Sequence, residues 1–119
     1  MNVALWIVAS LLAAAFLASG LVKLAWPKSK LVAKGNAWAE SFSPAAVKAI
    51  GVAEVLAAAG LILPRLLHVA EVLTPLAATG LALLMAGAAV VHQRRGESRA
   101  VAATVVYLAV AAFVAVARF

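Results

Sequence analysis

Two side chains of opposite charge lie within long apolar stretches of this sequence. Glu54 stands near the middle of the apolar run 45–63, and Lys23 stands near the end of the run 3–26. A lone carboxylate in apolar surroundings either takes up a proton or pairs with a cation. At about 1.5 Å of rise per residue, the two positions lie roughly 9 Å apart along parallel helix axes, which two extended side chains can nearly span. We therefore predict a pair between Lys23 and Glu54, direct or through water. The alternative is that Lys23 reaches to the interface while a neutral Glu54 hydrogen-bonds a neighbouring helix.

A histidine ends the third apolar run on the same side as Lys23. His92 follows Leu81, Met85 and Ala88 at steps typical of one helix face, and this face is predicted to pack inward. An imidazole gains and loses its proton near neutral pH, which suits a proton relay. We predict that His92 lines a vestibule with Lys23, the alternative being a histidine that lies among lipid headgroups.

Tyr107 is the one tyrosine in the chain and falls on the same helix face as Thr104. We predict that it hydrogen-bonds within the bundle, since a buried phenol usually finds a partner. Together with the three ionisable residues above, it completes the set of candidate ligand-binding residues: Lys23, Glu54, His92 and Tyr107. Polar groups that converge in an apolar setting are typical of a small-molecule site. The sequence assigns no catalytic residue, and whether the protein is an enzyme stays open.

The sequence contains no residues for thiol chemistry and no cluster of residues that would bind a metal. The chain has no cysteine, so disulfides, thiolate metal sites and cysteine redox relays are excluded. Its two histidines, His68 and His92, are expected at opposite ends of one helix, roughly a bilayer thickness apart. They cannot ligate one metal or haem within a single chain. We therefore predict no metal site, and no cofactor is evident from the residues themselves.

The composition places these residues in a membrane. The chain has 119 residues, of which 67% are apolar and 12% are charged. Ordinary soluble domains have roughly 45–50% apolar and about 25% charged residues. A soluble domain of this size leaves too much of its surface exposed to hide so many apolar side chains. The lipid bilayer is therefore the expected surroundings of most of the chain.

Four apolar runs are long enough to cross a bilayer, which takes about 20 residues. They predict an all-α fold, an integral membrane four-helix bundle that forms a single transmembrane domain over residues 1–119. The predicted helices cover about 3–26, 45–63, 69–91 and 98–117. Ser43 and Pro44 are a good helix start, and Pro64 is predicted to end the second helix, with a tight turn at residues 65–68. Small residues are dense in the second and third helices, which favours close packing.

The polar segment 27–43 joins the first two runs. Leu31, Trp38 and Phe42 fall at helical spacing within it, whereas Gly35 and Asn36 are predicted to break any helix. One interpretation is a short element that lies in the headgroup plane. The other is a solvated loop with one buried aromatic side chain.

The basic residues indicate an orientation. Eight of the ten Lys and Arg residues lie in or beside the first and third loops, and the other two, Arg65 and Arg118, lie on the opposite side. The positive-inside rule therefore predicts that loops 1 and 3 are cytoplasmic and that both termini lie outside. These charges form no basic face on a soluble domain, so anionic headgroups are a better partner for them than nucleic acid.

Three short motifs in this order resemble the DoxX-like family of small four-helix membrane proteins. The first helix ends with Ser19-Gly20-Leu21-Val22-Lys23. The second contains Gly51-Val52-Ala53-Glu54-Val55-Leu56 and continues through Gly60-Leu61-Ile62-Leu63-Pro64. The third contains Thr74-Pro75-Leu76-Ala77-Ala78 and continues to Leu81, Met85 and Val91-His92. The resemblance covers most of the chain, and the fourth helix offers no motif.

The resemblance implies a multi-pass protein of a bacterial cytoplasmic membrane. It also points to Lys23, Glu54 and His92. Relatives are linked to quinone-related or thiosulfate oxidation, to resistance against oxidants and electrophiles, and to complexes with soluble redox enzymes. The leading hypothesis is therefore a membrane subunit that binds a small hydrophobic or quinone-like molecule between its helices. Such a subunit would support a redox or detoxification partner, itself a membrane or membrane-associated protein.

Two other functions compete with this hypothesis. A non-catalytic accessory or assembly subunit of a larger membrane complex would need no ligand, and the sequence is fully compatible with it. A small multidrug-type transporter shares the length and the number of helices. Such transporters carry their essential membrane-embedded glutamate in the first helix, whereas Glu54 lies in the second. Transport is therefore the weakest of the three hypotheses.

Overall fold

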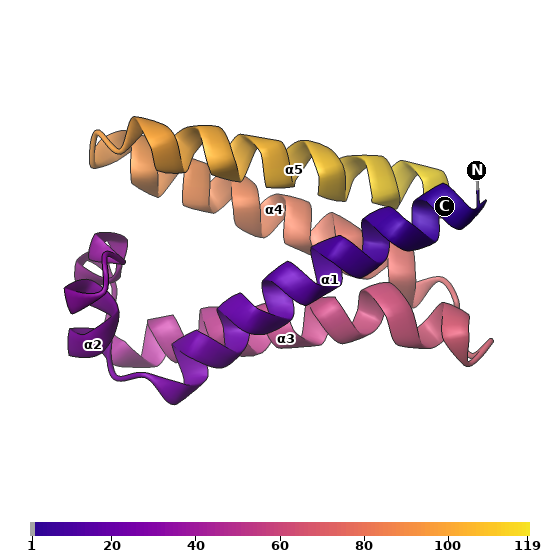
Figure 1. The fold of residues 1–119 in the computed structure, drawn as a ribbon, viewed down its shortest axis with the longest axis horizontal. Coiled ribbons are helices and arrows are strands. Elements are labelled where there is room, and N and C mark those ends of the chain that lie inside the picture. Colours follow the sequence, from indigo (N-terminus) through magenta and orange to yellow (C-terminus); the bar gives the residue numbers. More distant parts are fainter. Residues whose placement is uncertain (1) are drawn as a thin grey trace.

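A computed structural model describes residues 2–119 as an all-α bundle (Figure 1). Four long helices dominate it: α1 (Asn2–Ala25), α3 (Pro44–Leu66), α4 (Leu73–Arg94) and α5 (Ser98–Arg118). Two short helices, α2 (Lys28–Ala33) and the 3-10 helix η1 (Ala37–Ser41), lie in the connection between α1 and α3. The predicted fold class is confirmed. The first and last long helices agree with their predicted ranges to within one residue at each end.

All four long helices are long and apolar enough to cross a membrane. The bundle is 40 Å along its longest axis, close to the roughly 40–45 Å of a bilayer with its headgroup regions. Many large apolar side chains on its outer surface are exposed, among them Leu11, Leu83 and Val116. Exposed apolar side chains all around a bundle are stable in lipid and costly in water. The chain is therefore a multi-pass membrane protein.

The four long helices form two tightly packed pairs, α1 with α3 and α4 with α5, which are joined through contacts between α3 and α4. Figure 1 shows α2, η1 and the α4–α5 turn together at one end of the bundle, and both termini with the α3–α4 connection at the other. We call the first the basic end, because the segments 23–48 and 94–99, which contain eight of the ten Lys and Arg residues, lie there. The two helix pairs diverge toward it (Figure 1).

The main core lies where all four long helices meet, away from the basic end. It contains Phe16, Leu61, Leu81 and Val114, all nearly inaccessible, with small alanines between them. A second, smaller cluster at the basic end contains Leu31, Ala39 and Val47. Between these two clusters the helices enclose a cavity, which contains the candidate site.

The second long helix passes through Pro64, where it was predicted to end. It continues to Leu66, with Pro64 in its last turn. A proline removes the N–H that would bond the carbonyl four residues earlier, here that of Gly60. The Thr74 hydroxyl donates to this carbonyl at 2.9 Å, and Thr74 is completely buried. The hydrogen bond lost to proline is thus replaced from α4, and the helix does not need to stop.

The third long helix begins at Leu73, four residues later than predicted. His68 and Ala70 have positive φ angles of 55° and 48°, which no regular helix contains. The turn therefore occupies residues 67–72, and the predicted tight turn at 65–68 was placed too early. Pro75 becomes the third helical residue, where its missing N–H has no intrahelical partner to lose.

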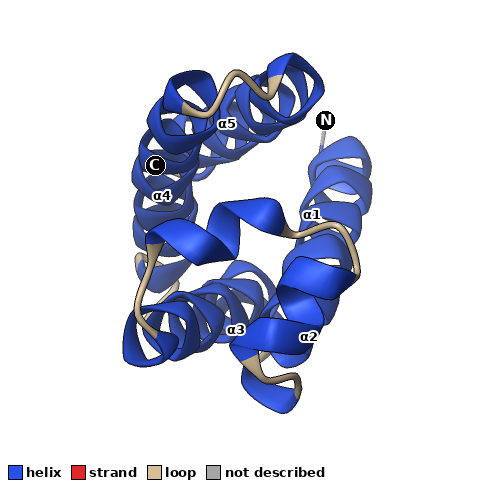
Figure 2. Cartoon of the chain, turned by 90° about the vertical axis from the view of Figure 1, so that its left-hand side faces the viewer, coloured by secondary structure: helices blue, strands red, loops and turns tan. Residues whose placement is uncertain are grey.

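The segment 27–43 folds as two short helices with a break between them. Gly35, with a φ of 98°, separates α2 from η1, as predicted. Leu31 is buried, and Trp38 and Phe42 are half-buried and contact each other edge to face. The segment is therefore packed onto the bundle and is not a freely solvated loop. Figure 2, which looks onto the basic end, shows η1 lying across it.

Candidate functional site

A close crossing of α1 and α3 positions the charged residues of the site. At Gly20 an added Cβ atom would lie 2.7 Å from the carbonyl oxygen of Gly51, and at Gly51 it would lie 3.0 Å from that of Gly20. Only glycine permits backbones to approach so closely. Lys23 follows Gly20 by one turn and Glu54 follows Gly51 by one turn, which places them on either side of the crossing because the two helices are antiparallel. Their side chains meet on its inner side.

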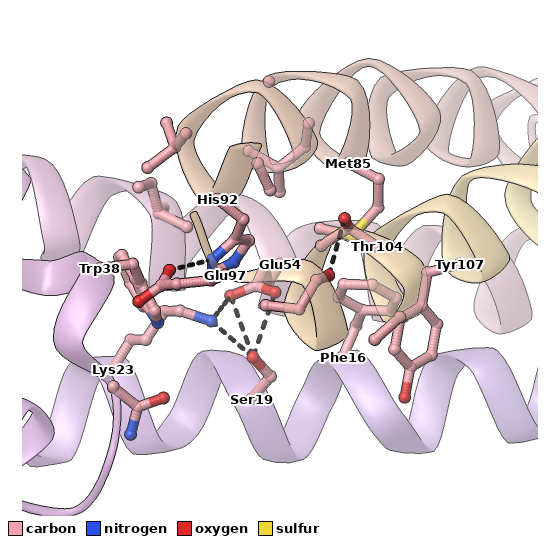
Figure 3. Close-up of a pocket in the computed structure, with 18 of the residues that line it drawn as sticks. Phe16, Ser19, Lys23, Trp38, Glu54, Met85, His92, Glu97, Thr104 and Tyr107 are labelled. Carbon is pink, nitrogen blue, oxygen red and sulfur yellow. Dashed lines mark hydrogen bonds and ion pairs between the residues drawn. The ribbon is translucent and has the colours of Figure 1, made fainter. Parts of the chain in front are cut away.

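Lys23 and Glu54 form a direct ion pair. Nζ of Lys23 lies 2.5 Å from Oε1 of Glu54, and the side chains are 13% and 2% exposed. Ser19, one turn before Lys23, accepts a hydrogen bond from Nζ at 2.5 Å and donates toward the Glu54 carboxylate at 3.2 Å (Figure 3). The predicted pair is confirmed in its direct form. Because Ser19 satisfies both partners, the charges are compensated where lipid offers no hydrogen bonds.

The ammonium group of Lys23 also contacts an aromatic ring of η1. Its Nζ lies 5.3 Å from the centroid of Trp38, within the range of a cation–π interaction. A second basic residue, Lys48 of α3, donates to the carbonyl oxygens of Leu24 and Trp26 at 2.6 and 3.1 Å, where α1 ends. A cation there satisfies carbonyls that a helix end leaves free. These contacts fasten α1, α3 and η1 together around the ion pair.

His92 lies at the basic end of α4 and is bound to the turn that follows it. Its Nδ1 is 2.7 Å from Oε1 of Glu97, and Nε of Arg95 is 3.4 Å from Oε2 of the same carboxylate. Since an ionised carboxylate only accepts, Nδ1 carries the proton and Nε2 is the nitrogen left for other partners. Arg95 also donates to the Ser41 hydroxyl of η1 at 3.1 Å. The α4–α5 turn is thereby linked to the segment that crosses the basic end.

The His92 contact is expected to make the stability of the α4–α5 turn depend on pH. The hydrogen bond with His92 lowers the pKa of the Glu97 carboxyl from its ordinary value of 4.5, partial desolvation opposes this, and Arg95 lowers it further. A carboxyl with a lowered pKa stabilises the fold above its unfolded pKa and loses that contribution as pH falls through its folded pKa. We expect the melting temperatures of wild type and Glu97→Gln to differ by a constant amount at neutral pH. The two should converge as pH falls below 4.5.

The control for this pH profile is Glu40→Gln, which removes an exposed carboxylate from η1 at the same end of the bundle. Its melting temperature should follow that of wild type across the range. If the melting temperatures of wild type and Glu97→Gln differ by the same amount at acid and neutral pH, protonation of Glu97 does not remove a stabilising contact, and the prediction is wrong.

One cavity of about 1110 Å³ lies between the helices beside the ion pair. All four residues predicted as ligand-binding line it, one from each long helix. Figure 3 shows Lys23, Glu54 and His92 close together, and Tyr107 farther along the cavity beside Phe16. His92 and Lys23 therefore share a vestibule, as predicted, although no direct contact joins them. Apolar side chains, among them Phe16, Met85 and Leu84, complete the walls. The cavity thus has a charged, hydrogen-bonding end and an apolar body.

Tyr107 reaches the cavity without the internal hydrogen bond that was predicted for it. Its ring contacts Phe16 edge to face, with centroids 5.1 Å apart, and the side chain is 38% exposed. Thr104, on the same face of α5, donates instead to its own helix, at the carbonyls of Ala100 and Val101. At this exposed position the Tyr107 hydroxyl has no hydrogen-bond partner among residues 2–119. Its phenol is left at the cavity wall (Figure 3).

Three residues of this site were not selected from the sequence. Ser19 could have been found, since it precedes Lys23 by four residues and so shares its helix face. Trp38 was placed in the connecting segment, but its contact with Lys23 depends on how that segment folds back. Glu97 is one acid in a basic turn, and its bond to His92 needs the positive φ of Gly96, 70°, between them. Sequence alone does not show these last two contacts.

The structure groups no three His, Cys, Asp or Glu residues of the range 2–119 in a way that would hold a metal ion. His68 lies on the surface at the end opposite the cavity, beside Glu71 at 3.7 Å. The two histidines are thus far apart, in agreement with their predicted positions.

Comparison with known proteins identifies the family of this chain. No curated protein and no solved structure gives a significant match. The sequence model of the DoxX-like family, in contrast, matches residues 7–114, nearly the whole chain. The match includes most of α1 and α5, all of the helices between them, and every residue that lines the cavity. The chain therefore belongs to the DoxX-like family.

Proposed function

We propose that this protein binds a small hydrophobic, quinone-like molecule between its helices and supports a redox or detoxification partner. The observation that carries the proposal is the cavity itself, about 1110 Å³, with a buried ion pair at one end and apolar walls elsewhere. Ligand pockets of proteins typically measure about 300–1,000 Å³ and combine apolar walls with a few placed polar groups. A structural ion pair needs no such space beside it.

The residues present fit a quinone ring. Its carbonyl oxygens are acceptors, and Lys23 and the unpartnered Tyr107 hydroxyl are donors at the cavity wall. The aromatic rings of Phe16 and Trp38, which also line the cavity, suit stacking on a flat ring. A bound quinone would supply two-electron redox chemistry. Glu54 would hold the Lys23 ammonium in place, and His92 would exchange protons with water at the basic end.

The electrons would come from a partner protein at the basic end. We propose that this end faces the cytoplasm, because it carries most of the basic residues and these favour the cytoplasmic side. The same charges would attract an acidic surface of a soluble partner. The cavity opens toward this end through Asn36, Glu97 and Arg99, so a reduced ligand would lie near that partner.

Quenching of Trp38 fluorescence tests the binding proposal. Trp38 lines the cavity, whereas Trp6 lies near Arg118 at the opposite end and Trp26 stacks beneath Lys30 outside the cavity. The variant Trp6→Phe/Trp26→Phe keeps Trp38 as the single tryptophan. Titration of this variant in lipid nanodiscs with decylubiquinone should give saturable quenching, because a bound quinone would lie within a few ångströms of the indole.

The matched control is Trp38→Phe, which keeps Trp6 and Trp26. Its quenching should rise linearly with the quinone dissolved in the lipid, without saturation. If the Trp38-only protein also shows only linear quenching, the cavity does not bind quinones. That result would favour the accessory-subunit hypothesis.

A further inference from the structure

The contacts between the long helices leave one side of the bundle weakly closed. α1 packs along α3, and α5 packs along α4, but α1 and α5 contact each other sparsely. The end-on view in Figure 2 shows these two helices set apart at the basic end. Deeper in the bundle they meet through the Phe16–Tyr107 ring contact. The cavity lies between this contact and the basic end, and its wall on this side consists of residues from α1 and α5.

The residues at this side of the cavity are small or reach the outer surface. Ala15 and Ser19 of α1 are half-buried, Ala103 and Tyr107 of α5 are exposed, and all four line the cavity. A side chain that lines a cavity and is also exposed lies at an opening. We call this opening between α1 and α5 the lateral portal and define it by these four residues.

The surface next to the lateral portal is apolar. Leu11, one turn before Ala15 on α1, is 68% exposed, and Val106, next to Tyr107 on α5, is 61% exposed. The portal lies between α1 and α5, two of the four helices long and apolar enough to cross the bilayer. It therefore faces the hydrocarbon chains of lipids. The other opening of the cavity, at the basic end, is lined by Asn36, Glu97 and Arg99 and faces headgroups or water.

The two openings differ in polarity, and the polar groups of the cavity lie between them. We propose that the ligand passes sideways from the bilayer through the lateral portal, and that it is an amphiphile with one apolar tail that stays in the portal. Its hydrogen-bonding head contacts Lys23, Glu54 and Ser19, and the small side chains of Ala15 and Ala103 leave room for the tail. This inference rests on the proposed function, because it assumes that the cavity holds a ligand.

The absence of natural cysteines permits a test on folded protein. The substitution Ala103→Cys is made in the variant that keeps Trp38 as its single tryptophan. The purified protein is then labelled with N-ethylmaleimide, and quinone association is compared before and after labelling of the same sample. Stopped-flow quenching by decylubiquinone measures the association rate. A bulky group at the portal should slow association at least about tenfold, because the route from the lipid is obstructed.

Two labelled controls locate the effect. Ala102→Cys places the same label on the neighbouring exposed residue of α5, which does not line the cavity, and its association rate should change less than about twofold. Asn36→Cys places the label at the basic end. Slower association after labelling at Asn36→Cys, but not at Ala103→Cys, would show that the ligand enters through the basic end and would overturn the portal.

The tail is tested by a second probe. Ubiquinone-0 has the same ring as decylubiquinone and lacks the tail. Labelling of Ala103→Cys should therefore weaken the binding of decylubiquinone by a larger factor than the binding of ubiquinone-0. An equal loss for both probes would show that the portal does not hold the tail. Absence of saturable binding by the unlabelled protein would overturn the proposed function and the portal together. Normal binding with no effect of the Ala103→Cys label would overturn the portal alone.

Discussion

Replacing Lys23 with methionine is expected to lower the free energy of unfolding by up to about 3–5 kcal/mol at neutral pH. The physical reason is the charge left behind. Glu54 is 2% exposed, and its carboxylate is held by Nζ of Lys23 at 2.5 Å and by the Ser19 hydroxyl. Without the ammonium group, a buried anion remains with a single hydroxyl as partner. Unfolding in mixed detergent–SDS micelles would measure the change.

The double variant Lys23→Met/Glu54→Gln separates the cost of an unpaired charge from the value of the pair. It removes both charges, keeps side chains of similar volume, and leaves Ser19 an amide to bond. Replacing a buried ion pair with neutral groups is often nearly neutral, so most of the stability should return, to within about 1 kcal/mol of wild type. A double variant that is less stable than Lys23→Met would show that the pair itself holds the bundle together.

Gly20→Ala is expected to lower the free energy of unfolding by about 1–3 kcal/mol through overpacking. The new methyl group would lie 2.7 Å from the Gly51 carbonyl oxygen and 2.8 Å from a methyl of Val55. The first neighbour is backbone and cannot rotate away, so α1 and α3 must separate. Lys23 and Glu54 flank this crossing, and their separation should also weaken quinone binding in the Trp38 assay.

Gly80→Ala is the matched control for this substitution. Gly80 lies inside α4, and an added Cβ would meet nothing within 4 Å. Alanine is favoured over glycine inside helices by up to about 1 kcal/mol, so this variant should be as stable as wild type or slightly more stable. Equal destabilisation at both positions would contradict the role given to the Gly20–Gly51 crossing.

The sequence was enough to predict the parts of this fold that depend on one segment at a time. Four apolar runs of sufficient length predict four membrane helices, and rare charges within them stand out, as Lys23 and Glu54 did. Their pairing could be predicted because hydrocarbon offers a carboxylate few other partners. His92 could be placed near them because charge and helix count put both loops on one side.

The remaining features depend on contacts between segments that no periodicity reveals. Pro64 ordinarily ends a helix, and only the approach of Thr74 to the Gly60 carbonyl lets α3 continue. Glycines are common in membrane helices, so the sequence did not single out Gly20 and Gly51 as the crossing. The Tyr107 ring packs edge to face on Phe16 of α1, and its hydroxyl bonds no residue of the range 2–119. This placement is a property of the packed bundle and cannot be read from either helix alone.

The measurement that tests the central claim most directly is mass spectrometry of small molecules and proteins that co-purify from the native membrane in mild detergent. Wild type should be compared with Lys23→Met/Glu54→Gln, which is expected to fold but lacks the charged end of the cavity. We expect a quinone-like molecule with a single apolar tail in wild type and not in the double variant. The same small molecules in both samples, with a partner protein retained equally by both, would contradict a binding site at the ion pair.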